Sequence, residues 1–127
     1  MSDVERKWLE QARYDLDTAR AMLTSGRYLY VLFCCQQAVE KALKALYIHR
    51  RGDFPPRLHN LPRLAEAAGL GIEGERLDFM AELSVYYIQS RYPEEVDELA
   101  KAATPEKAKS VLVASEEVVE WLVSMMK

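Results

Sequence analysis

The sequence predicts an all-α fold, an up-and-down bundle of four long helices plus one short helix. Apolar residues recur three and four positions apart along most of the chain, which is the spacing of one helix face. No stretch shows the strict alternation of a half-buried strand. The five glycines and five prolines fall mostly between the periodic stretches, where joints are expected. We expect residues 1–127 to form a single domain.

The first two helices are expected over residues 3–25 and from residue 28 to about residue 51. Ser25-Gly26 ends the first, and the short connection makes the two antiparallel neighbours. The second, YLYVLFCCQQAVEKALKALYIHRR, contains no Gly or Pro. Its first half is apolar on all sides, so it needs cover on both sides and is expected at the centre of the bundle. Seven side chains lie close to one line along this helix, and the line is apolar in its first half and polar in its second. They are Tyr30, Phe33, Cys34, Gln37, Glu40, Lys41 and Lys44.

Capping residues and prolines predict where the later helices begin and end. Pro55-Pro56 excludes helix before a short helix that Asn60 caps and that ends before Gly69. A fourth helix is expected over residues 75–90, because Pro93 disfavours helix at the residue before it. Residues 94–103 allow no assignment beyond a helical turn.

The last helix is expected to start at Thr104-Pro105-Glu106, where a capping residue is followed by Pro and an acidic residue. This order of elements, with short joints between long helices, is typical of an up-and-down bundle.

Composition narrows the class of protein. No apolar run approaches the ~18 residues that span a bilayer, and the N-terminal residues are charged, unlike a signal peptide. Cys34 and Cys35 are neighbours on one helix and point about 100° apart, which excludes a disulfide between them. A cytoplasmic protein is expected.

Charge is unevenly distributed. Residues 40–63 carry six basic and two acidic side chains, whereas residues 73–127 carry six basic and twelve acidic ones. A basic middle on an acidic body favours a local anion site over an extended nucleic-acid groove. A solvated helix end is the simpler explanation of the same basic run.

No cofactor or metal is expected. His49 and His59 lack the spacing of metal ligands, and no glycine-rich phosphate loop is present.

The candidates that remain are the polar residues of the central helix and the break at Arg91-Tyr92-Pro93. A guanidinium at a helix end suits a phosphate, but it equally suits the carbonyls of its own helix. Glu40 and Lys44 equally suit a simple surface ion pair, and Asp15 either pairs with a base of the central helix or is ordinary surface. The tyrosines near the break either stack on a base or belong to the core.

Four segments in order resemble the HEPN family (higher eukaryotes and prokaryotes nucleotide-binding domain): WLEQARYDLDTARAML, QQAVEKALKAL, LHNLPRL and YYIQSRYPE. Many family members are metal-independent ribonucleases that act as dimers, with an Arg at a helix end and a His four to six residues later. Arg91 matches the Arg, but residues 95–98 read Glu-Val-Asp-Glu and lack the His. The sequence is more similar to a subgroup bearing Arg-Tyr-Pro, often encoded beside a minimal nucleotidyltransferase in toxin–antitoxin-like pairs.

The resemblance therefore implies a homodimer that binds a nucleotide or RNA phosphate and lacks the usual ribonuclease activity. Its expected ligand-binding residues are Arg91, Tyr92, Lys41, Lys44, Gln37 and Glu40. His59 is expected to be structural, at the start of the short helix. Two alternatives stay open: an RNA endonuclease that uses Arg91 with Asp97 or His59, and a purely structural partner of a nucleotidyltransferase.

Overall fold

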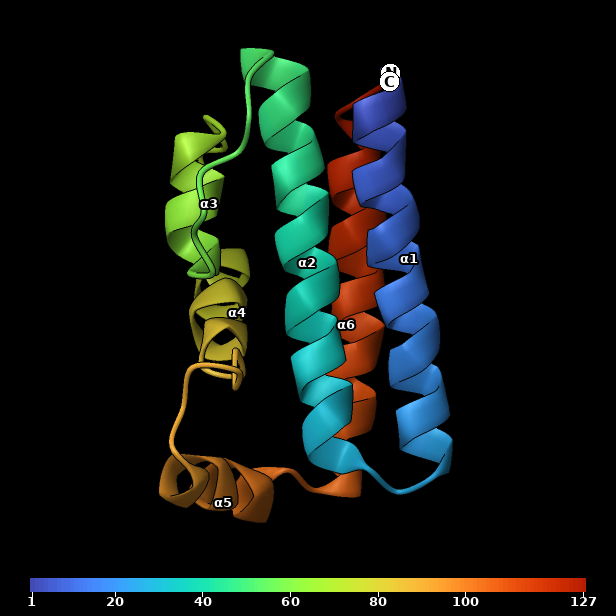
Figure 1. The fold of residues 1–127 in the computed structure, drawn as a ribbon, viewed down its shortest axis with the longest axis vertical. Helices are drawn as coiled ribbons and strands as arrows, with labels where there is room; N and C mark the ends of the chain where they lie inside the picture. The colour runs from blue at the N-terminus through green and yellow to red at the C-terminus, as the bar shows by residue number, and fades with distance from the viewer.

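Six helices and no strand make up the fold, seen in a computed structural model that describes residues 1–127 (Figure 1). Their bounds are α1, Asp3–Thr24; α2, Tyr28–Arg51; α3, Leu61–Ala67; α4, Glu75–Ser84; α5, Pro93–Ala102; and α6, Pro105–Ser124. The predicted all-α bundle is confirmed. None of the helices is both long enough and apolar enough to cross a bilayer.

The central position of α2 is confirmed. The three longest helices, α1, α2 and α6, lie side by side, and α3 and α4 follow one another along the other side of α2. Helix α5 lies across the bundle near the N-terminal end of α2 (Figure 1). Helix α2 contacts every other helix. Its side chains at Val31, Leu32, Val39 and Leu43 are completely buried. Gly52 ends α2 with φ of 67°, a left-handed conformation that suits glycine after a helix.

Local caps set the helix starts that the sequence predicts. The Asn60 side chain accepts a hydrogen bond from the Arg63 N–H at 3.0 Å, and Thr104 accepts one from the Lys107 N–H at 3.1 Å. Such caps satisfy N–H groups that have no partner within the helix. The α3 and α6 starts therefore follow from the residues themselves.

The expected fourth long helix is wrong in its second half, because α4 ends at Ser84 rather than near Ser90. Beyond Ser84 the chain turns, and Tyr86 and Ile88 are 4% and 8% exposed. The Ser84 hydroxyl accepts a hydrogen bond from the Leu61 N–H at 2.7 Å, which joins the end of α4 to the start of α3. Burial of these side chains outweighs the helical pattern that the sequence suggests.

Residues 94–103, expected as no more than a helical turn, lie almost entirely within the helix α5, Pro93–Ala102. Pro93 occupies its first turn, where the missing N–H costs nothing, and Val96 and Leu99 pack against the core. Arg91 therefore lies in the turn between α4 and α5, not at the end of a helix.

Candidate functional site

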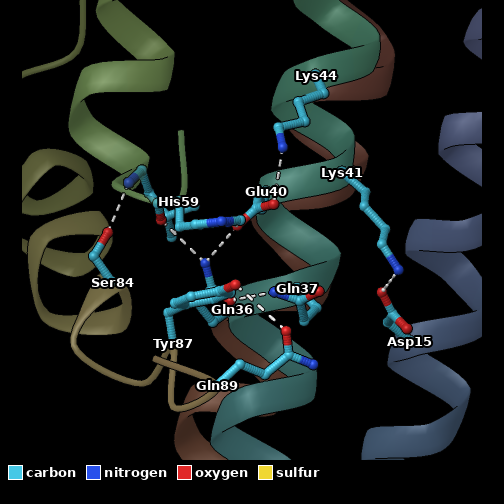
Figure 2. Close-up of polar contacts among 11 residues, drawn as sticks. Asp15, Gln36, Gln37, Glu40, Lys41, Lys44, His59, Ser84, Tyr87 and Gln89 are labelled. Atoms are coloured by element: carbon cyan, nitrogen blue, oxygen red, sulfur yellow. Dashed lines mark hydrogen bonds and ion pairs between the residues drawn. The ribbon is translucent and has the colours of Figure 1, made fainter. Parts of the chain in front are cut away.

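The carboxylate of Glu40 lies buried at the middle of α2 and is 4% exposed. Its Oε2 accepts a hydrogen bond from Lys44 Nζ at 3.0 Å, and its Oε1 accepts one from Gln36 Nε2 at 3.0 Å (Figure 2). Lys44 is 7% exposed, so the alternative of a surface ion pair is excluded. Burying a charge is costly unless it is paired and hydrogen-bonded, and both conditions are met here.

His59 attaches the loop before α3 to this carboxylate. Its Nδ1 lies 3.0 Å from Glu40 Oε1, and its backbone carbonyl accepts a hydrogen bond from Gln36 Nε2 at 3.1 Å. The ring stacks on Tyr87, with centroids 3.8 Å apart and planes 9° apart. Asn60, rather than His59, supplies the helix cap. The His59 ring thus joins α2 to the segment that follows α4 (Figure 2).

Gln37 and Gln89 form the outer edge of the same cluster. Gln37 Nε2 donates to Gln36 Oε1 at 2.7 Å, and the Tyr87 hydroxyl donates to Gln89 Oε1 at 3.4 Å. The Phe33 ring lies near Tyr87 as well, with centroids 6.3 Å apart. Gln36 is completely buried and was not among the expected site residues. The only signal for it was a second glutamine in an apolar run.

Lys41 points away from the Glu40 cluster and toward α1 (Figure 2). Its Nζ lies 2.8 Å from Asp15 Oδ2, in a pair whose side chains are 22% and 17% exposed. Asp15 therefore pairs with a base of the central helix and is not an ordinary surface residue. Lys44 Nζ also lies 5.6 Å from the centre of the Trp8 ring, within the range of a cation–π contact.

The guanidinium of Arg91 is held by two intramolecular contacts. Its Nε donates to the Val85 carbonyl at 3.0 Å, and its Nη1 donates to Glu95 Oε2 at 3.1 Å. The side chain is 30% exposed. Arg91 therefore caps a carbonyl just beyond its preceding helix, which is one of the two roles that the sequence allowed. Its Nη2 makes no hydrogen bond within the chain.

Tyr92 lies next to Arg91 and is 74% exposed. Its backbone N–H donates to Glu95 Oε1 at 3.2 Å at the start of α5. Of the six expected site residues, Arg91 and Tyr92 are adjacent, whereas Lys41 and Lys44 have carboxylate partners on α1 and α2. No hydrogen bond or ion pair joins either lysine to Arg91.

The thiols are unsuited to nucleophilic chemistry near neutral pH. Burial raises the pKa of Cys34 to about 11, with the negative charge of Asp15 adding to the shift. Burial raises the pKa of Cys35 to about 12. Since the thiolate is the reactive form, both residues stay unreactive thiols. No three His, Cys, Asp or Glu side chains are placed to hold a metal ion together.

These features define an α-helical bundle with a buried polar cluster on its central helix and an arginine in the turn between α4 and α5. The HEPN domain profile matches residues 5–126, and the chain belongs to this family. A comparison with curated proteins found no match.

Two solved structures are similar over nearly their whole length. The crystal structure of TT1696 from Thermus thermophilus is 28% identical, with a TM-score of 0.81, over 97% of this chain and 98% of that one. The crystal structure of ST0689, an archaeal HEPN homologue, is 23% identical, with a TM-score of 0.77, over 99% of this chain and 100% of that one. At 23% identity, the similarity to ST0689 concerns the fold alone.

Replacing Glu40 tests the energetic role of the buried cluster. We expect Glu40→Ala to lower the free energy of unfolding by about 3–5 kcal/mol, because Lys44 is then left buried without its partner. The double variant Glu40→Leu/Lys44→Met should recover a large part of that loss. Urea denaturation measures both. Equal losses in the single and the double variant would contradict this role of the pair.

Replacing His59 separates structure from ligand binding. We expect His59→Ala to lower the free energy of unfolding by about 1–2 kcal/mol, since a hydrogen bond and a ring stack are lost. Affinity for a phosphate ligand should stay nearly unchanged. Thermal melting and a binding titration on the same samples test this. A large loss of binding at an unchanged melting temperature would place His59 in the site.

Proposed function

We propose that this chain is a homodimeric HEPN protein that binds a nucleotide or RNA phosphate at Arg91 and Tyr92. One observation carries the proposal: Arg91 is anchored by the Val85 carbonyl while its Nη2 has no partner. A guanidinium has five donors, so it can hold that carbonyl and still contact a phosphate. The exposed Tyr92 ring beside it offers a surface on which a base can stack.

The residues of the central helix have a supporting role in this proposal. Glu40 holds His59, and His59 stacks on Tyr87 in the segment that leads to Arg91. Gln37 supports the same cluster through Gln36. Lys41 and Lys44 are engaged by carboxylates, so they act at most through their long-range positive potential. Phosphate contact therefore rests chiefly on Arg91.

We infer the dimer from the apolar N-terminal part of the line of α2 side chains that runs from Tyr30 to Lys44. Tyr30 is 45% exposed, and Phe33 and Cys34 are half-buried on the same part of the helix. Exposed aromatic surface next to partly buried apolar surface is typical of a contact between proteins. A second copy of this chain would cover it.

The partner proposal rests on sequence. Arg91-Tyr92-Pro93 resembles the subgroup often encoded beside a minimal nucleotidyltransferase, so we propose that the chain acts with such an enzyme in a toxin–antitoxin-like pair. Co-purification of a nucleotidyltransferase from the native source supports this. The alternative of a purely structural partner predicts the same co-purification but no phosphate binding.

Phosphate binding should stabilise the fold by mass action, by about 2.7 kcal/mol at a hundredfold excess of ligand over Kd. We expect thermal-shift titration with nucleotides, short RNA and pyrophosphate to raise the melting temperature. Arg91→Ala should abolish the shift, and Arg91→Lys should restore part of it, because the fork of donors is lost. Arg57→Ala is a matched control, since Arg57 is exposed and forms no ion pair.

If no phosphate ligand shifts the melting temperature, the binding proposal fails and the structural-partner alternative replaces it. Cleavage of the RNA during the titration would favour the endonuclease alternative.

The dimer is tested by placing a charge on its proposed contact. We expect Tyr30→Glu and Phe33→Glu to weaken association, because each buries an unpaired charge in the interface. Phe33 also packs within its own subunit, near Tyr87, so Tyr30→Glu is the cleaner variant. Sedimentation velocity measures association. A wild-type protein that stays monomeric at tens of micromolar would contradict the dimer.

A further inference from the structure

Glu95 already places a carboxylate at the donors of the proposed phosphate site. Its Oε2 accepts a hydrogen bond from Arg91 Nη1 at 3.1 Å, and its Oε1 accepts one from the Tyr92 N–H at 3.2 Å. The two oxygens of one anion thus bridge a guanidinium and a backbone amide. A phosphate bound to Arg91 would use oxygens in the same way.

We propose that Glu95 is an internal competitor for the Arg91 anion site and sets its affinity for phosphate. The inference rests on the proposed function. A phosphate that binds the free Nη2 and also takes the donors of Arg91 Nη1 and of the Tyr92 amide must displace the Glu95 carboxylate. Glu95 lies in the first turn of α5, close to Arg91 in the chain, so its carboxylate stays at high local concentration near the guanidinium.

The competition is weak enough to be reversed by a ligand. Glu95 is 48% exposed, and exposed ion pairs contribute about fivefold or less to an equilibrium. The Arg91 Nε bond to Val85 is independent of Glu95, so the guanidinium stays anchored when the carboxylate leaves. Displacement therefore changes the Glu95 side chain without requiring α5 to unfold.

Glu95→Gln separates the charge of this residue from its role at the start of α5. The glutamine retains an oxygen that accepts the Tyr92 N–H, and glutamine is favoured at this third helical position. The substitution removes the negative charge and replaces Oε2, the acceptor for Arg91 Nη1, with an amide NH2 that cannot accept from it. Glu94→Gln is a matched control, because Glu94 is exposed in the same turn, makes no hydrogen bond or ion pair, and gives the same change in net charge.

The experiment is a calorimetric titration of the full chain with inorganic pyrophosphate at constant ionic strength. We expect Glu95→Gln to bind about threefold or more tightly than wild type, and Glu94→Gln to change the affinity less than twofold. Melting temperatures of the ligand-free variants confirm that α5 is intact.

Two results would overturn the inference, and they differ in what they say of the proposed function. If wild type binds and the two glutamine variants have equal affinity, Glu95 is no competitor and the phosphate site stands. If wild type and Glu95→Gln both fail to bind pyrophosphate, nucleotides and short RNA, the phosphate site itself is wrong and the competitor role falls with it.

Discussion

The structure depends on the need to neutralise one buried carboxylate, that of Glu40. A charge in the interior is stable only with partners in good geometry, and here these are Lys44, Gln36 and His59. The first two come from α2 itself, but His59 comes from the loop before α3. The pairing of one side chain on α2 therefore holds the loop against the central helix, next to the point where Asn60 begins α3.

The same constraint extends to the turn that carries Arg91. His59 stacks on Tyr87, and the segment from Val85 to Tyr92 turns instead of continuing α4 so that Tyr86 and Ile88 become buried. The Val85 carbonyl, freed from the helix by that turn, accepts the hydrogen bond from Arg91. A pairing inside the bundle thus positions an arginine near its surface, through a series of direct contacts.

Much of the fold could be predicted from sequence, because α1, α2, α3 and α6 combine strong periodicity with local caps or breaks. The end of α4 could not, since Tyr86, Tyr87 and Ile88 fit a helical stripe and leave the helix only because of where the core lies. A helical wheel of α2 shows the direction in which each side chain points, but it does not show which residue of a neighbouring helix that side chain meets. It placed Lys41 and Lys44 on one line, whereas Lys41 faces Asp15 of α1 and Lys44 faces Glu40.

The sequence offered two roles for Arg91, capping a carbonyl or binding a phosphate, and geometry makes these roles compatible. Capping uses Nε, on the side of the guanidinium that faces the Val85 carbonyl, while Nη1 contacts an exposed carboxylate and Nη2 has no partner. An arginine fixed at one edge loses less side-chain freedom when a ligand binds at the other edge. The contact that resembles a purely structural cap is therefore also a means of preorganising the guanidinium for an anion.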